Sequence, residues 1–109
     1  MTTITRDELR ATLGSVVVLD TLGGQYYAQQ HLPGALSLVE SEVAERVGTL
    51  LPDKDAAVVT YCTNPSCNNS KAVANRLTAL GYTNVRRYVE GIEDWVAAGL
   101  PVESSGVRA

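Results

Sequence analysis

Hydrophobic and polar positions along the chain divide it into short apolar runs and longer segments with helical spacing. The continuous, largely β-branched runs at residues 16–19 and 56–61 are typical of strands that are buried on both faces. Weaker strand patterns cover residues 35–39 and 84–89. Each run stops at a polar residue or a loop, so the chain contains at least four candidate strands.

Helical patterns separate these strands. Thr5 and Glu8 form a capping-box pattern that predicts a short helix ending near Gly14. A second helix is expected over residues 24–30, before Pro33 and Gly34. Apolar residues at helical spacing predict three more helices: Val43, Val47, Leu50 and Leu51 before Pro52; Val73, Leu77 and Leu80 before Gly81; and Ile92, Trp95 and Val96 after Gly91. This alternation indicates an α/β fold: an open, mostly parallel sheet with helices on both faces.

Length and composition limit the organisation of the chain. It has 109 residues and a net charge of −3, which is the size of one domain, so we expect residues 1–109 to form a single domain with a flexible tail at 103–109. The acidic balance provides no basic field for nucleic acid or an anionic membrane. No apolar run approaches the length of a membrane span, and residues 1–10 lack the apolar stretch of a secretory signal. A cytoplasmic location is therefore expected.

The loop after residue 61 carries the candidate chemistry. It follows a buried strand and leads into a helix, so its peptide N–H groups and the helix N-terminus favour a small anion. Cys62 opens this loop, and the N–H groups are expected to lower the pKa of its thiol and make it a nucleophile. The alternative is a buried core cysteine. The expected substrate or anion-binding residues are Thr63, Asn64, Pro65, Ser66, Cys67, Asn68, Asn69 and Ser70, with Ser70 as the helix cap.

An ordered series of motifs resembles the rhodanese-like family of sulfurtransferases. The series is Leu19-Asp20, His31-Leu32-Pro33-Gly34-Ala35, Tyr61-Cys62, Gly81-Tyr82, Asn84-Val85, Gly91, Trp95 and Ala98-Gly99-Leu100-Pro101. The resemblance implies a rhodanese-like, five-stranded sheet. It also implies that Cys62 carries a sulfane sulfur as a persulfide, taken from thiosulfate or a persulfide donor and passed to a thiol or cyanide acceptor, or to a protein acceptor. No metal or organic cofactor is implied.

The loop departs from the family pattern. In the family the capping Ser or Thr lies six residues from the cysteine, and the loop includes a cationic side chain. Here Ser70 lies eight residues after Cys62, and the loop contains no Arg or Lys. The Arg that commonly follows the early strand is also missing, because the chain reads Asp20-Thr21-Leu22. Since bidentate Arg is suited to oxyanions, we expect a persulfide donor rather than thiosulfate.

Two other functions stay open. Arsenate reductases and phosphatases of this fold also have a cysteine at the start of such a loop. The loop of this chain, however, lacks the Arg that those enzymes need. A sulfur-carrier or regulatory binding module would keep Cys62 but turn over slowly. The uptake of one sulfur that depends on Cys62 distinguishes transfer from arsenate reduction, and multiple-turnover rates distinguish a catalyst from a carrier.

Cys67 has two interpretations. It is a partly buried, space-filling thiol, or it resolves a persulfide or sulfenate on Cys62 by forming a disulfide. A metal site formed by these two cysteines and His31 is disfavoured, because zinc sites usually have four ligands or paired Cys-x-x-Cys spacing. His31 itself is expected to bond backbone carbonyls.

Three further residues are accessory candidates. Asp20 either orients loop donors or, as we favour, caps a turn at a strand end. Lys71 is the cation nearest to the loop in sequence. Arg87, with Arg86, either brings positive charge to the pocket mouth or, as we favour, is a solvated surface residue.

Overall fold

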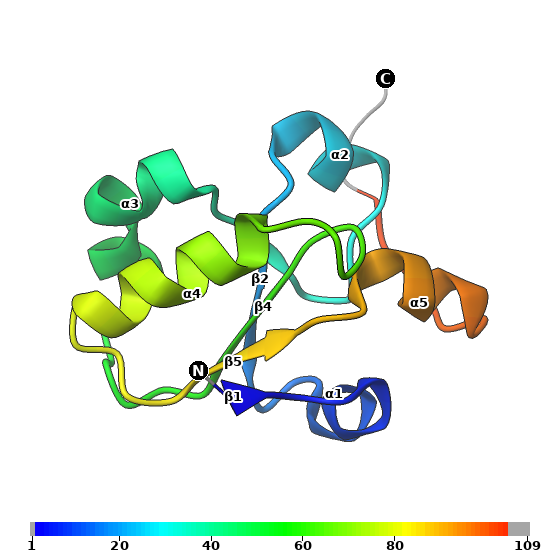
Figure 1. Cartoon of the computed structure of the whole chain (residues 1–109), viewed down its shortest axis with the longest axis horizontal. Coiled ribbons are helices and arrows are strands. Elements are labelled where there is room, and N and C mark those ends of the chain that lie inside the picture. Colours follow the sequence, from blue (N-terminus) through cyan, green and yellow to red (C-terminus); the bar gives the residue numbers. More distant parts are fainter. Residues whose placement is uncertain (1, 105–109) are drawn as a thin grey trace.

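The computed structural model, which describes residues 2–104, contains a sheet of five parallel strands. The strand order is β1-β5-β4-β2-β3, with β1 at Thr2–Thr3, β2 at Val17–Asp20, β3 at Leu36–Ser37, β4 at Val58–Tyr61 and β5 at Val85–Tyr88 (Figure 1). All four residues of the central strand β4 are buried, as its continuous apolar pattern predicts.

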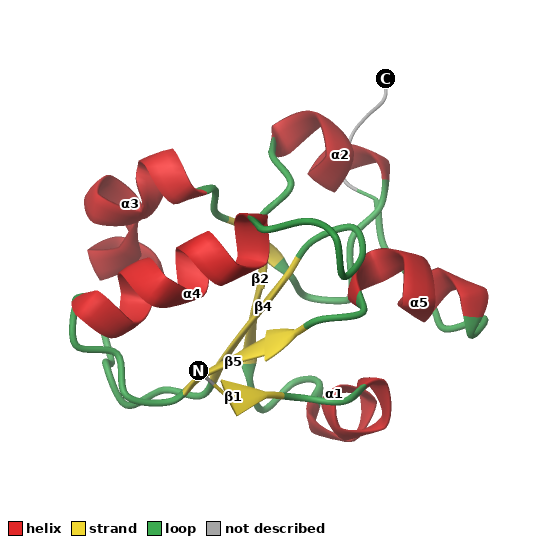
Figure 2. Cartoon of the chain, in the orientation of Figure 1, coloured by secondary structure: helices red, strands yellow, loops and turns green. Residues whose placement is uncertain are grey.

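Helices cover both faces of this sheet (Figure 2). Their bounds are α1 Arg6–Thr12, α2 Gly24–Gln29, α3 Val43–Leu50, α4 Asn69–Ala79 and α5 Gly91–Ala97, with a 3₁₀ turn at Glu40–Glu42. One hydrophobic cluster joins α3 and α4 to the sheet, and the other joins α1 and α5 to its opposite face. The expected α/β architecture is therefore confirmed, with a sheet whose strands are all parallel.

The ends of the chain differ from the sequence expectation. The pattern did not indicate β1, which consists of two exposed threonines paired in register with Arg86 and Arg87. Glu103, the first residue of the expected tail, exchanges two backbone hydrogen bonds of 2.8 Å with His31. The flexibility of the tail stays a prediction, and residues 105–109 lie outside the described residues.

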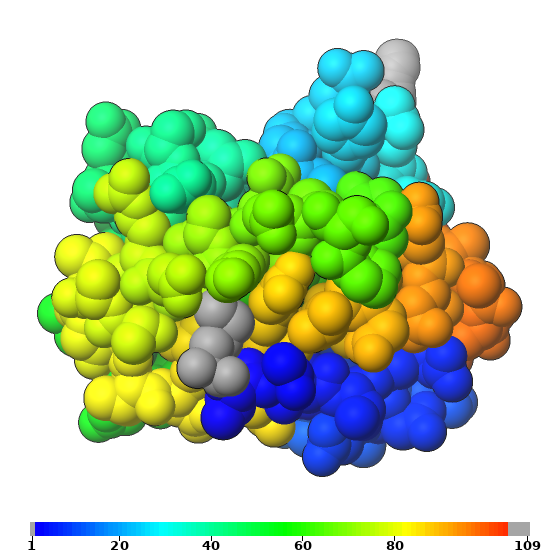
Figure 3. Space-filling view, in the orientation of Figure 1, coloured from blue at the N-terminus to red at the C-terminus, as the bar shows by residue number. Residues whose placement is uncertain are grey.

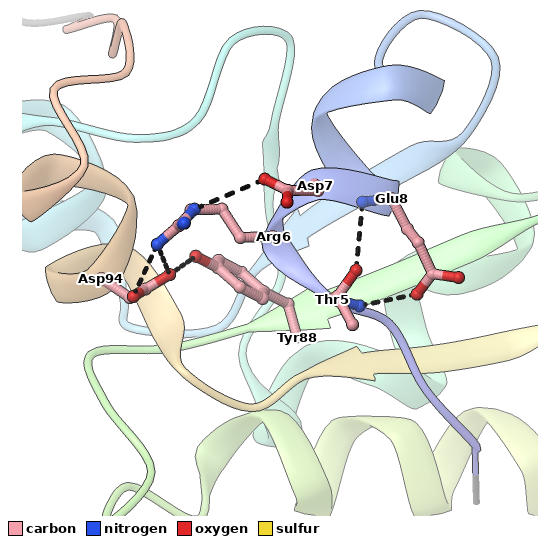
Figure 4. Close-up of polar contacts among 6 residues, drawn as sticks. All are labelled: Thr5, Arg6, Asp7, Glu8, Tyr88 and Asp94. Carbon is pink, nitrogen blue, oxygen red and sulfur yellow. Dashed lines mark hydrogen bonds and ion pairs between the residues drawn. The ribbon is translucent and has the colours of Figure 1, made fainter.

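Polar contacts fix α1 against the carboxyl-end side of β5 and α5 (Figure 4). The Thr5 hydroxyl accepts from the Glu8 backbone N–H, and the Glu8 carboxylate accepts from the Thr5 N–H, which confirms the capping box. Arg6 donates to Asp94 at 3.1 Å, and the Tyr88 hydroxyl donates to the same carboxylate at 2.6 Å. Burial and this hydrogen bond to Asp94 raise the pKa of Tyr88. The end of β5 and the start of α5 are thereby tied to α1.

The parallel register brings three strand ends together. Asp20 pairs with Tyr61, and Tyr61 pairs with Tyr88, so β2, β4 and β5 end in line. Ligands of open parallel sheets bind beyond such ends. Figure 3 shows the segment that follows β4, in green, at the surface between α2 in cyan and α5 in orange.

Within residues 2–104, no helix is long and apolar enough to cross a membrane. The cytoplasmic location, the single-domain organisation and the lack of nucleic-acid or membrane partners stay predictions.

Candidate active site

Cys62 lies at the strand-to-helix loop and is almost fully buried, with 1% of its surface exposed. Its thiol donates to the Cys67 carbonyl at 3.2 Å and to the Ser70 hydroxyl at 3.5 Å. Burial and the hydrogen bond with Cys67 raise the pKa of the Cys62 thiol, against the lowering effect of the Ser70 side chain and amide. The expected low pKa is therefore wrong, because the sequence did not reveal that the thiol is enclosed and hydrogen-bonded with the Cys67 side chain.

The lowered pKa that was expected for Cys62 is found at Cys67 instead. Burial alone would raise its pKa, but hydrogen bonds from the Cys62 side chain and from the Asn69 and Thr63 amides, together with the charge of Arg87, lower it below the ordinary value for a thiol. Cys67 is also less buried than Cys62, and neither cysteine is in a disulfide. The two thiols therefore titrate as a coupled pair, with the pKa raised at Cys62 and lowered at Cys67.

Arg87 reaches the loop from β5. Its Nε donates to the Ser70 hydroxyl at 2.8 Å, and its Nη2 donates to the Cys67 carbonyl at 2.9 Å. The interpretation of Arg87 as a solvated surface residue is wrong. The cation that the loop sequence lacks is supplied by a neighbouring strand, because the β4–β5 register pairs Arg87 with Thr60, two residues before Cys62.

Ser70 is not the cap of α4. The helix begins at Asn69, with Asn68 at the N-cap position and no side-chain cap, and Ser70 is buried in its first turn. The Ser70 carbonyl accepts from the Thr60 hydroxyl at 3.0 Å, which fixes this turn against β4. Its hydroxyl is thus free to contact Cys62 and Arg87 instead of capping the helix.

The start of α5 holds the other side of the loop. The backbone N–H of Ile92 donates to the Cys62 carbonyl at 2.9 Å, and that of Glu93 donates to the Thr63 carbonyl at 3.0 Å. Gly91 makes this approach possible, because a Cβ added there would lie 2.5 Å from the Thr63 carbonyl carbon and 2.6 Å from the Cys62 carbonyl oxygen. Sequence reasoning missed this role. The only signal was a glycine directly before a helix that follows a strand.

Asp20 caps a turn at the end of β2, as favoured from the sequence. Its Oδ1 accepts from the Leu22 N–H at 2.9 Å, and its Oδ2 accepts from the Tyr61 hydroxyl at 2.7 Å. Burial raises the pKa of this carboxyl, against lowering by both hydrogen bonds. The Asn69 side chain, meanwhile, donates to the Thr21 carbonyl at 3.2 Å and so ties α4 to the end of β2.

The remaining candidates are less central. The Asn64 side chain accepts from the Ser66 N–H at 3.0 Å and donates to Glu93 at 3.2 Å. Thr63 contributes to a groove of about 200 Å³ between α2 and α5, together with Leu22, Tyr26, Gln29, Gln30, Ile92 and Glu93. Pro65, Ser66, Asn68 and Lys71 are exposed, and the structure shows no contact that brings Lys71 to Cys62.

His31 stacks on Tyr27 with ring centroids 3.9 Å apart, and its Nδ1 lies 2.7 Å from the Tyr27 carbonyl, as its structural interpretation predicts. Across residues 2–104, no group of three or more His, Cys, Asp or Glu side chains is arranged to hold a metal ion.

These features define a parallel α/β domain with a cysteine at a strand-to-helix loop. Residues 5–98 match the family model of the rhodanese-like domain. The chain therefore belongs to the rhodanese-like domain family, as the ordered motifs indicated.

Known proteins of two kinds are similar to this chain. An HTH-type transcriptional regulator of Mycobacterium tuberculosis is 34% identical over 102 residues, which is 92% of this chain but only 44% of the regulator. The thiosulfate sulfurtransferase PspE of Escherichia coli is 33% identical over 76 residues, 70% of each chain. A solved rhodanese with anions from E. coli has a TM-score of 0.67 and 29% identity, covering 82% of this chain and 98% of that one.

Proposed function

We propose that this protein is a sulfurtransferase in which Cys62 takes a sulfane sulfur and passes it to a thiophilic acceptor. Membership of the rhodanese-like family and the similarity to a thiosulfate sulfurtransferase support this reaction class. The observation that carries the assignment to Cys62 is the contact chain from Arg87 through the Ser70 hydroxyl to the Cys62 sulfur.

This contact chain can stabilise the Cys62 sulfur when it becomes an anion. Because the Arg87 Nε–H donates to the Ser70 oxygen, the Ser70 hydroxyl hydrogen is available to the Cys62 sulfur when that sulfur is anionic. The Ser70 hydroxyl and amide both lower the pKa of Cys62, although burial outweighs them. The site therefore favours a thiol at rest and offers donors to the sulfur anion that forms during transfer.

The reaction divides into two displacements. Cys62 sulfur attacks the terminal sulfur of the donor, a new S–S bond forms, the donor's S–S bond breaks, and the departing thiolate takes the proton that Cys62 gives up. An acceptor thiolate or cyanide then attacks the outer sulfur of the persulfide and returns Cys62 to its thiolate. The raised pKa of Cys62 reduces the thiolate fraction at neutral pH, but a more basic thiolate is intrinsically more nucleophilic.

A low-molecular-weight or protein persulfide is the donor that we propose. Two nitrogens of Arg87 donate to the Ser70 hydroxyl and the Cys67 carbonyl. Fewer of its N–H groups are therefore available to bind an oxyanion such as thiosulfate. The groove beside Thr63 combines apolar side chains with two glutamines and carries Glu93, so its charge disfavours a small dianion. A faster steady-state rate with thiosulfate than with glutathione persulfide would contradict this preference.

The central test is intact-mass analysis after incubation with glutathione persulfide. At early times the protein should gain one sulfur atom, and Cys62→Ser should gain none. Ser70→Ala should load sulfur about tenfold more slowly, because one charge-assisted donor to the sulfur anion is lost. Ser15→Ala is the matched control, since Ser15 is exposed and lies outside the loop. Equal loading by both serine variants contradicts the contact chain, and arsenate reduction without sulfur uptake supports the arsenate reductase alternative.

A low-turnover sulfur carrier or regulatory module is the second candidate. It is favoured by the 34% identity to a transcriptional regulator that is more than twice as long as the matched region. Reaction with excess donor and acceptor thiol distinguishes the two functions. Many turnovers per chain support the transferase, whereas one sulfur loaded and slow release support the carrier.

A further inference from the structure

Cys67 lies in the same loop as Cys62 and close to its sulfur. The Cys62 thiol donates to the Cys67 carbonyl at 3.2 Å, and the hydrogen bond between the two side chains shifts both pKa values. The Cys67 N–H donates to the Asn64 carbonyl at 3.1 Å, which folds the loop back on itself. Arg87 then fixes the Cys67 carbonyl from β5.

The two cysteines differ in accessibility as well as in the direction of their pKa shifts. Cys62 is enclosed, with 1% of its surface exposed, whereas Cys67 is only partly buried. The sulfur of Cys62, which would be the inner sulfur of a persulfide, is therefore shielded from molecules in solution. Cys67 lies in the same loop, and hydrogen bonds together with the charge of Arg87 lower the pKa of its thiol.

We propose that Cys67 is a resolving cysteine that attacks the inner sulfur of a Cys62 persulfide and releases hydrosulfide. This inference rests on the proposed function, because it requires a persulfide on Cys62. It assigns Cys67 the second of its two sequence interpretations instead of a space-filling role.

The step balances without an added oxidant. The Cys67 thiolate forms a bond to the Cys62 sulfur, the S–S bond of the protonated persulfide breaks, and hydrosulfide leaves with the bonding electron pair and the proton. The two cysteine sulfurs are oxidised to a disulfide, and the sulfane sulfur is reduced to sulfide. A dithiol reductant must then reduce the disulfide before Cys62 can load again.

The consequence is a choice between two fates for the loaded sulfur. When an acceptor thiol is present, it removes the outer sulfur and Cys62 is free at once. Without an acceptor, Cys67 discharges the sulfur as hydrosulfide and leaves the protein as an intraloop disulfide. The loop thereby limits the lifetime of a persulfide that finds no acceptor.

The test follows the persulfide in the absence of any free thiol. The protein and Cys67→Ser are loaded with glutathione persulfide, desalted rapidly, and followed by intact mass and by alkylation of released hydrosulfide. The unmodified protein should lose the added sulfur, become lighter than the reduced chain by two hydrogens, and release one hydrosulfide per chain. Cys67→Ser should keep its sulfur for at least about tenfold longer, because an attack within one loop is lost.

The outcomes separate this inference from the function on which it depends. Equal persulfide lifetimes in the two proteins, with no disulfide, overturn the resolving role and leave sulfur transfer intact. If folded Cys67→Ser takes up no sulfur, the proposed loading of Cys62 fails instead. Disulfide formation with hydrosulfide release in the unmodified protein alone supports both.

Discussion

Substitution of Gly91 by alanine tests whether the start of α5 positions the Cys62 loop. Gly91 has φ +76°, and an added Cβ would lie 2.5 Å from the carbonyl carbon and oxygen of Thr63. These are backbone atoms, so no side chain can rotate out of the way. Gly99 has nearly the same φ, +75°, but its added Cβ meets nothing within 4 Å. Gly99→Ala is therefore a matched control that carries the conformational cost without the collision.

The expected losses in the free energy of unfolding follow from the cost of the left-handed conformation and the cost of the collision. A left-handed conformation costs an L-residue roughly 1–2 kcal/mol, which applies to both variants. Forcing a methyl group into a packed site costs a further 1–3 kcal/mol or so, which applies only at Gly91. Gly91→Ala should therefore lower the free energy of unfolding by about 2–5 kcal/mol, against about 1–2 kcal/mol for Gly99→Ala.

Urea unfolding at neutral pH measures both values, and sulfur loading measured under folded conditions reports on the loop. Because the collision involves the backbone next to Cys62, Gly91→Ala should also slow loading, whereas Gly99→Ala should not. Unfolding free energies within about 0.5 kcal/mol of each other, together with equal loading rates, would refute the positioning role of Gly91.

Three further predictions concern charge and protonation near the loop. Arg87→Gln should slow sulfur loading about tenfold, because its contacts from β5 to the loop are lost. The neighbouring Arg86→Gln should change the loading rate little. Intact-mass analysis of samples quenched at successive times measures both rates. Brief treatment with iodoacetamide at pH 7 should label Cys67 before Cys62, since the pKa is lowered at the first thiol and raised at the second, and peptide mapping that shows the reverse order would contradict the assignment. The raised pKa of Asp20 means that the folded protein binds its proton more tightly than the unfolded chain, so its contribution to stability is largest at low pH and is lost as pH rises from about 4 through the folded pKa. Unfolding free energies from pH 4 to 7 should therefore fall relative to those of Asp20→Asn, and a constant difference would contradict this shift.

The four strands β2 to β5 could be predicted from the sequence, and the signal is strongest for the two that are most buried. Residues 17–20 and 58–61 lie within or beside the two continuous apolar runs, and both are in the middle of the sheet. β1 could not be found in this way, because two exposed threonines at a sheet edge carry no apolar signal and pair only with β5. Glu103 was missed for a similar reason, since its bonds to His31 use backbone atoms.

The loop was predicted as the site, but not the direction of its dipoles. Sequence spacing shows that peptide N–H groups follow Cys62, whereas only the folded loop shows that the Asn69 and Thr63 amides act on Cys67. Arg87 was misplaced because it lies 25 positions from Cys62 and approaches only through the β4–β5 register. Long-range pairing of this kind leaves no trace in local periodicity.

Two neighbouring cysteines can combine properties that a single thiol cannot have at neutral pH, namely high basicity in one sulfur and easy ionisation in the other. A sulfur carrier benefits from a basic, strongly nucleophilic sulfur, but such a sulfur is mostly protonated at neutral pH. Here the raised pKa belongs to the enclosed Cys62 and the lowered pKa to the more accessible Cys67, so the more easily ionised thiol lies beside the sulfur that we propose is loaded. Since removal of either sulfur changes the ionisation of the other, the titration of each cysteine should shift when its neighbour is replaced by serine. A Cys67 thiol that titrates identically with and without Cys62 would mean that the two sulfurs act independently.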